Sequence, residues 1–461
     1  MINDIKNNFL LLESMRNAGN VLWEKYGRNV FIYDILNYIN KISNKTNDLQ
    51  LIKTKPIKNL IILDPGLKDK GSHHHQINYN IYKKLSKKTN IFVLANEKIN
   101  IKLPYEVKNI FRNSIYDFDY SKPSIVNQQA IIFSREIINE FQNYNVPFCL
   151  YIHTCTLPLL LGISFVIDKI IDKIDILYIE LMFLPNGYEQ FHNNNNNLYD
   201  YLYLQALNKI TNTFLKNFKY VRISTSNKFF KIYYENLLNK IINNNITIDI
   251  HPHVMLTDKA FTIHKSENSH YKFDGINILV HAGDPRPGKG LQWIKDNISE
   301  LINLTNHDVY FHLHLNKIRF PDDYPVEVEI VSWLMNFSIS NCRMIIHSDK
   351  IAEDDWFNFL SNFDYFIIPN EPNYYKHKTS GLVFDVIYTL GSAERVFVFE
   401  NTLSYKILRD QSIYISKIDD FIKYAKKLNR KNVLYDKSLI SKNDIFSKPH
   451  AEYVALKLGF V

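Results

Sequence analysis

The sequence is poor in glycine and cysteine, and it has no long apolar run. Glycine supplies 13 of 461 residues, about 3% against a usual ~7%, so a cluster of glycines is more informative here than in an average chain. The three cysteines (Cys149, Cys155 and Cys342) show no metal-ligand spacing and form no disulfide framework, which favours a reducing cytosol. The longest apolar run, 155–167, is well short of the ~20 residues that span a bilayer, so we expect a buried helix there.

Two further features are missing. The first residues lack a cationic leader, a long apolar core and a small-residue cleavage site, so we predict no secretory signal and a cytoplasmic location. The formal charge of +8 is spread along the chain, without the compact basic arm of nucleic-acid-binding proteins. It favours phosphates or lipid headgroups as partners, and segment 155–167 leaves a peripheral contact with the inner face of a membrane as an alternative.

The hydrophobic pattern divides the chain into helical and alternating parts. Apolar residues recur at roughly 3.6 spacing in residues 1–50, which predicts a helical extension. From Asn59 onwards short apolar runs alternate with helical patterns, in two series that predict an α/β fold with two doubly wound parallel-sheet domains facing a central cleft. The strands are expected at 59–64, 91–95, 148–153, 176–181, 220–224, 276–283, 309–315, 343–347, 364–369, 395–400 and 412–416, and the domains at 51–255 and 256–435, with a final helix in 436–461 that packs back on the first domain.

The strongest functional signal is the segment HAGDPRPGKGLQWIKDN, residues 281–297. Three glycines (Gly283, Gly288 and Gly290) fall within eight residues, after a predicted strand and before an amphipathic helix. Such a loop brings the backbone close to a phosphate, which Arg286 and Lys289 would neutralise. The segment lacks Walker A and G-x-G-x-x-G spacing, so an ordinary strand-to-helix turn with solvated charges remains the alternative.

A second segment has related features. Thr379-Ser380-Gly381 opens an apolar helix after the strand expected at 364–369. Ser380 is predicted to cap this helix, whose first amide groups would then point at a ligand. Asp385, one turn further on, could accept hydrogen bonds from a ribose diol, or could simply be an acidic residue favoured by the helix dipole.

GDPRPGKG (283–290) followed by SGLVFD (380–385) resembles the C-terminal half of GT-B glycosyltransferases, in particular retaining enzymes similar to glycosyltransferase family 4. The resemblance implies two Rossmann-like domains, with the donor bound by the second. It assigns the donor diphosphate to Arg286 and Lys289 in the loop of Gly283, the phosphates also to Ser380 and Gly381, and the ribose to Asp385.

The sequence departs from the family in one respect. The family's two glutamates eight residues apart are missing: His377 stands eight residues before Asp385, and the nearest upstream glutamate is Glu371, which we include among the substrate-binding candidates. Retention and inversion of configuration therefore both stay open. Inversion requires a protein base within reach of the acceptor.

Histidines in the first half are candidates for that role. The segment after the first strand (65–85) contains Gly66, Gly71 and three consecutive histidines, and in GT-B enzymes the corresponding loop faces the donor. We predict His73 near the reacting centre and Gly71 and His74 at the substrate, with surface or capping roles as the alternative. Consecutive side chains diverge, so at most two of His73, His74 and His75 could share a metal ion, and we predict no metal site.

Further candidates lie at the ends of predicted strands. His153 is a catalytic candidate because it lies at the carboxyl end of its strand, where ligands of α/β sheets bind, although a buried structural histidine is the alternative. Glu180 is a candidate for the same reason, because it lies at the end of the strand expected at 176–181, but it has less support. His312 and His314 alternate along one strand, and we interpret them as structural.

The sequence therefore predicts a cytoplasmic glycosyltransferase that needs no metal or cofactor. It would move a sugar from a nucleotide-diphosphate donor to a glycan, a lipid-linked or a protein acceptor in the synthesis of surface glycans. Fixed cations suit this chemistry because the leaving diphosphate gains negative charge. The alternatives are a sugar-nucleotide epimerase of the same architecture and a non-catalytic nucleotide- or carbohydrate-binding protein.

Overall fold

The computed structural model describes most of the chain from residue 59 onwards. The helical extension expected at 1–50, Gly71 and His377 lie outside the described residues. The described ranges are 59–68, 73–99, 102–117, 122–181, 196–217, 219–239, 247–254, 273–316, 318, 321–349, 351, 355–376, 378–410, 413–425, 428 and 449–460.

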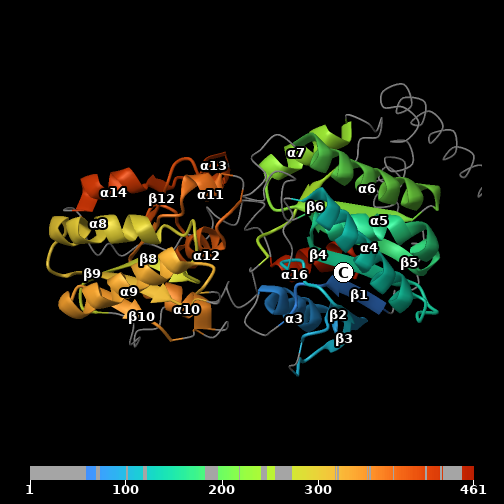
Figure 1. The fold of residues 1–461 in the computed structure, drawn as a ribbon, viewed down its shortest axis with the longest axis horizontal. Coiled ribbons are helices and arrows are strands. Elements are labelled where there is room, and N and C mark those ends of the chain that lie inside the picture. The colour runs from blue at the N-terminus through green and yellow to red at the C-terminus, as the bar shows by residue number, and fades with distance from the viewer. Residues whose placement is uncertain are drawn as a thin grey trace, which may run out of the picture.

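The described residues form two lobes, each built on a parallel sheet (Figure 1). The first sheet has seven strands in the order β3-β2-β1-β4-β5-β6-β7, and the second has six in the order β10-β9-β8-β11-β12-β13. The predicted pair of doubly wound sheets is thus confirmed. The strands are β1 (Asn59–Asp64), β2 (Asn90–Asn96), β3 (Glu106–Phe111), β4 (Phe148–Cys155), β5 (Ile174–Leu181), β6 (Tyr220–Thr225), β7 (Asp249–Ile250), β8 (Ile276–Gly283), β9 (Val309–Leu315), β10 (Met344–His347), β11 (Tyr365–Ile368), β12 (Val396–Val398) and β13 (Ser416–Lys417).

Helices cover both faces of each sheet, which explains why the inner strands are apolar on both sides. In β1, Leu60 and Ile62 belong to a buried cluster with α3 and α16, whereas Ile61 and Leu63 belong to the cluster of α4, α5 and α6. The helices of the first lobe are α3 (His73–Leu85), α4 (Pro123–Phe141), α5 (Leu157–Ile170), η1 (Ile171–Lys173), α6 (Asn196–Lys216), α7 (Lys228–Asn239) and α16 (His450–Lys457), and those of the second are α8 (Leu291–Leu304), α9 (Pro325–Ser340), α10 (Trp356–Leu360), α11 (Pro372–Tyr375), α12 (Gly381–Leu390), α13 (Leu403–Asp410) and α14 (Ile418–Tyr424).

The apolar run 155–167 forms the buried helix α5, as predicted. Nearly all of its side chains are buried, and Phe165 is the main exception at 50% exposed. No helix in the described part of the chain is both long and apolar enough to cross a membrane.

Helix α16 returns to the first lobe, although it follows the whole second lobe in the sequence. Figure 1 shows it in red beside α3. Val454 of α16 and Leu458, directly after the helix, are fully buried against that lobe, and Lys84 of α3 forms an ion pair with Glu452 at 3.3 Å. The first lobe is therefore built from two stretches of chain that lie far apart in the sequence.

The predicted local structure is wrong at two places and misses two strands. The strand expected at 412–416 is a two-residue strand, Ser416–Lys417, and β3 and β7 were not predicted. The three histidines begin helix α3 instead of lying in a loop. This matters for the site, because a helix turn directs His73, His74 and His75 towards different neighbours.

Candidate active site

The cationic loop lies between β8 and α8, where the sequence predicted it. Lys289 is half-buried and Arg286 is exposed. Gly290 precedes α8 with a φ of 77°. In the described part of the chain, neither cation forms an ion pair with a carboxylate, so both charges are available to an anion.

Two glycines allow this loop to pack closely on the segment after β11. A Cβ on Gly288 would lie 2.5 Å from Cγ of Tyr374, and one on Gly290 would lie 1.9 Å from the carbonyl oxygen of Pro369. Both glycines also have positive φ, which L-residues rarely adopt. The amide of Glu371 donates a hydrogen bond of 2.9 Å to the carbonyl of Gly288. These contacts fix the position of the cationic loop.

Two lysines lie near the ring of Tyr375. Lys289 Nζ lies 5.8 Å and Lys378 Nζ 4.7 Å from the ring centroid. Burial lowers the pKa of Lys378 to about 8. Burial also lowers the pKa of Lys289 to about 8, with the neighbouring charge of Arg286 acting in the same direction. Cations that have lost hydration and repel one another provide a favourable site for a phosphate.

The start of α12 is the second phosphate candidate. Ser380 occupies the N-cap position but makes no capping hydrogen bond, so the predicted cap interaction is not formed. Its Oγ is buried without a hydrogen-bond partner among the described residues, while its amide donates to Ser404 Oγ at 2.9 Å. No atom lies within 4 Å of the position of a Cβ on either Gly381 or Gly283. The backbone at both glycines therefore borders open space.

Asp385, the predicted ribose ligand, is buried against a second-lobe helix and the segment that joins the lobes. Its Oδ2 accepts a hydrogen bond from Trp356 Nε1 at 3.1 Å, and its Oδ1 lies 3.8 Å from His253 Nδ1. Burial lowers the pKa of His253 to about 3 and raises that of Asp385 to about 7. Because the imidazole is neutral, this contact is not an ion pair. Ribose binding by Asp385 stays a prediction.

These pKa directions predict how Asp385 affects stability. The folded state holds the carboxyl proton more tightly than the unfolded chain, so ionisation should destabilise the protein as the pH rises from about 4 to about 8. Asp385→Asn keeps an acceptor for Trp356 but does not ionise. We expect the variant to melt higher than the wild type at about pH 8 and equally at about pH 4. The exposed Asp296→Asn is the control, and equal pH dependence of wild type and Asp385→Asn would contradict the prediction.

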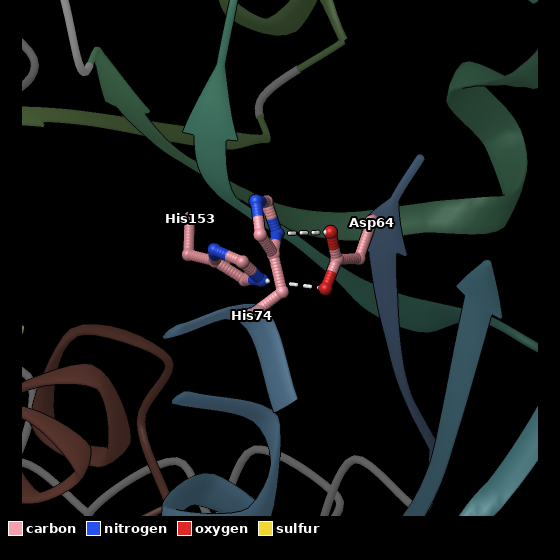
Figure 2. Close-up of side chains that lie close together, drawn as sticks. All are labelled: Asp64, His74 and His153. Carbon is pink, nitrogen blue, oxygen red and sulfur yellow. Dashed lines mark hydrogen bonds and ion pairs between the residues drawn. The ribbon is translucent and has the colours of Figure 1, made fainter. Parts of the chain in front are cut away.

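On the first lobe, Asp64, His74 and His153 form one hydrogen-bonded cluster (Figure 2). Asp64 is the last residue of β1, and its Oδ1 lies 2.6 Å from His74 Nδ1 on the first turn of α3. Its Oδ2 lies 3.1 Å from His153 Nε2 on β4 and accepts from Asn78 Nδ2 at 2.6 Å. All three members are at most 3% exposed. The parallel pairing of β1 with β4 brings the two strand ends together.

The chemistry of the carboxylate defines the imidazole tautomers. Burial alone would raise the pKa of Asp64, but His74 and His153 outweigh it and hold the pKa well below its usual value. An ionised carboxylate only accepts, so His74 donates from Nδ1 and His153 from Nε2. The remaining nitrogens then accept from Tyr116 and Thr154, each at 2.8 Å. The cluster is a continuous chain of donors and acceptors.

His73 lies beside this cluster, with its ring centroid 4.3 Å from that of His74. Its Nε2 is 3.3 Å from the Tyr116 hydroxyl. Burial lowers its pKa well below the usual value, and the positive charge of Arg286 in the other lobe acts in the same direction. His75 lies apart and contacts Tyr105 at 2.9 Å.

Other candidates have structural partners. Glu180 is buried and accepts hydrogen bonds from His450 of α16. His312 contacts Asn277 and His347, and His314 contacts the carbonyl of Asp349, in agreement with their interpretation as structural. Sequence reasoning missed Asp64, whose place at the end of a buried strand was the available signal. It also missed Tyr375 and His450, for which the sequence holds no comparable signal.

Two groups in the described residues could hold a metal ion: Asp64 with His74 and His153, and Glu180 with His251 and His450. Each combines two imidazoles with one carboxylate, a set that suits Zn²⁺. In the first group every side chain has hydrogen bonds that account for its orientation without an ion.

No protein-family model matches the sequence, and no curated protein is significantly similar to it. Solved structures with the same fold include the N-terminal domain of Candida albicans trehalose-6-phosphate phosphatase, with a TM-score of 0.57 and 9% identity over 87% of this chain and 96% of that chain. The Burkholderia vietnamiensis α,α-trehalose-phosphate synthase (UDP-forming) has a TM-score of 0.57 and 8% identity over 88% and 100%.

A trehalose-6-phosphate structure from E. coli with bound UDP-2-fluoro glucose also has a TM-score of 0.57, with 8% identity over 88% of this chain and 99% of that chain. The neighbours include GT-B glycosyltransferases and do not single out family 4. The predicted GT-B fold is confirmed: this chain has the fold of the GT-B glycosyltransferases.

Proposed function

We propose that the protein is a glycosyltransferase that uses a nucleoside diphosphate sugar. The observation that carries the proposal is the pair of cations on the β8–α8 loop, Arg286 and Lys289, which glycine contacts hold against the segment between β11 and α12. In the reaction the bond between the anomeric carbon and the β-phosphate oxygen breaks, and the nucleoside diphosphate leaves with an additional negative charge. Fixed cations directed at that charge lower the barrier.

The proposed donor site combines charges with backbone groups. Arg286 and Lys289 neutralise the diphosphate, and the first amides of α12 with Ser380 Oγ contact its oxygens. The unpaired Ser380 Oγ supports this assignment, because a buried hydroxyl without a partner is unfavourable until a ligand supplies one. The protein residues named here provide this stabilisation without a metal.

The histidine cluster is the proposed acceptor side. Asp64 orients His74 and His153, and Tyr116 links His74 to His73. In an inverting reaction the acceptor hydroxyl attacks the anomeric carbon and His73, which is neutral, takes its proton. In a retaining reaction the leaving phosphate takes the proton and His73 only positions the acceptor. The anomeric configuration of the product distinguishes the two.

Nucleotide binding tests the proposal before any acceptor is known. We expect nucleoside diphosphates to raise the melting temperature well above the effect of the matching nucleosides. At 100 times its dissociation constant, a ligand adds about 2.7 kcal/mol to the free energy of unfolding. The affinity should fall above about pH 8, because Lys289 then loses its proton. Equal shifts from nucleoside and diphosphate would refute the phosphate site.

Products separate the remaining functions. A transferase releases nucleoside diphosphate only with an acceptor present or, slowly, by transfer to water. An epimerase changes the sugar without an acceptor, and a binding protein gives no turnover. The acceptor classes to screen are glycans, lipid-linked sugars and proteins, as expected for the synthesis of surface glycans.

A further inference from the structure

A second buried polar cluster lies outside the proposed active site. It joins three segments that are far apart in the sequence: Glu180 near the end of β5, His251 directly after β7, and His450, the first residue of α16. One ligand atom from each side chain lies within 4.8 Å of the other two. All three side chains are buried, with Glu180 fully inaccessible to solvent.

Hydrogen bonds account for two of the three members. His450 Nε2 lies 2.9 and 3.1 Å from the two carboxylate oxygens of Glu180. His251 instead contacts the carbonyl of Pro252 through Nδ1, at 2.9 Å. Because a carbonyl only accepts, Nδ1 of His251 carries the hydrogen and Nε2 holds a lone pair. No hydrogen bond joins that lone pair to another described residue.

This arrangement of His251 is typical of metal ligands. Histidines that bind metals through one nitrogen usually donate the other N–H to a carbonyl or carboxylate, which fixes the tautomer and the ring orientation. The cluster also concentrates negative charge and lone pairs in a buried place. The ligand atoms of His251 and Glu180 lie within 4.8 Å of each other, so a cation between the two side chains would bind both.

We propose that Glu180, His251 and His450 bind one divalent transition-metal ion, with Zn²⁺ as the best match to two imidazoles and a carboxylate. Three protein ligands leave one position of a tetrahedral site for water. On binding, His450 Nε2 exchanges its hydrogen bond with Glu180 for a bond to the metal. A neutral ring moves its proton from Nε2 to Nδ1, and a protonated ring keeps the proton on Nδ1 and releases the one on Nε2 to solvent.

The first cluster does not carry the same inference. In the Asp64 cluster each imidazole nitrogen of His74 and His153 has a hydrogen-bond partner, so no lone pair is left over. In the second cluster the lone pair of His251 has no such explanation. The two groups have the same composition, and this makes one a control for the other.

The expected role of the ion is structural. It would tie the sheet of the first lobe to the chain that leaves this lobe at His251 and to the helix that returns at His450. Because the three segments come together only in the folded protein, the binding free energy of the ion would add to the stability of the fold.

The test uses the full-length protein, Zn²⁺ and a chelator. Dialysed protein should take up about one Zn²⁺ per chain, and Co²⁺ in its place should show the visible bands of low-symmetry coordination. Chelation should lower the melting temperature, and added Zn²⁺ should restore it. If wild-type protein takes up no stoichiometric metal and melts identically with Zn²⁺ and with chelator, the proposal is wrong.

Two variants locate the ion. His251→Asn retains a donor for the Pro252 carbonyl but loses the metal ligand, so its metal content should fall below about 0.1 per chain and its melting should no longer respond to chelator. His74→Asn, in the other cluster, should bind Zn²⁺ like the wild type. Metal retained by His251→Asn, or lost in His74→Asn alone, would overturn the assignment. If His251→Asn does not fold, X-ray absorption of the Zn²⁺-loaded wild-type protein tests the ligand set. Two imidazoles at the metal support the assignment, and their absence overturns it.

Discussion

Arg286→Ala is expected to lower kcat/KM for sugar transfer by about 10² to 10³, equivalent to roughly 2.7–4 kcal/mol of transition-state stabilisation. The reason is that Arg286 is exposed at the loop and carries a charge that the described residues leave unpaired. Lys289→Ala should have a similar effect below about pH 8 and a smaller one above it, where the wild-type lysine is itself neutral. The measurement is initial velocity against donor concentration at several pH values.

Lys295→Ala is the matched control for these variants. Lys295 lies on α8, just beyond the loop, and pairs with Glu329 on the protein surface at 3.5 Å. Its loss changes the net charge by the same amount but should leave turnover within about twofold, because surface ion pairs contribute little. If Lys295→Ala is as damaging as Arg286→Ala, the effect is one of overall charge, and the proposed phosphate contact is incorrect.

Removing residues 449–461 should have the largest effect on stability. The truncation exposes the first-lobe surface that α16 covers, including Leu60 and Ile62 of β1. It also removes His450, the hydrogen-bond partner of Glu180, and losing a hydrogen bond to a charged group costs about 1.5–3 kcal/mol. We expect a markedly lower melting temperature or an insoluble product. An unchanged melting transition would show that α16 does not stabilise the lobe.

Two point variants test whether the truncation destabilises the protein through lost packing or only because the chain is shorter. Leu458 is fully buried and Leu456 is 48% exposed, although they are two residues apart on the same segment. Leu458→Ala should destabilise the protein by about 2–5 kcal/mol, as for other buried leucines. Leu456→Ala should be close to neutral by comparison. Both are measured by denaturant unfolding, and equal effects would contradict the packing described for α16.

The sequence pattern predicted those strands that are buried on both faces. β1, β8 and β9 were predicted with their observed bounds, because helices cover both sides and most of their positions are apolar. β3 lies at the edge of the sheet and only its last residue is buried, and β7 has only two residues. Neither gives a periodic signal long enough to recognise.

The site was predictable only where the residues lie close together in the sequence. The glycine spacing identified Arg286 and Lys289, but not Tyr375, which comes from the segment after β11 and packs beside them. The three consecutive histidines were recognised, yet the carboxylate that orients His74 comes from the end of β1. Such pairs depend on strand order and helix direction, which no local pattern in the sequence contains.

The return of α16 has a consequence for the order of events during synthesis. The first lobe needs residues 449–460 to complete it, and these emerge 195 residues after Val254 (449 minus 254). At ~5–20 residues per second the ribosome needs about 10–40 s to make that stretch. During this time the second lobe can fold, while Leu60, Ile62 and Tyr151 still lack their last covering helix. Nascent chains stalled before α16 should therefore bind chaperones through this face.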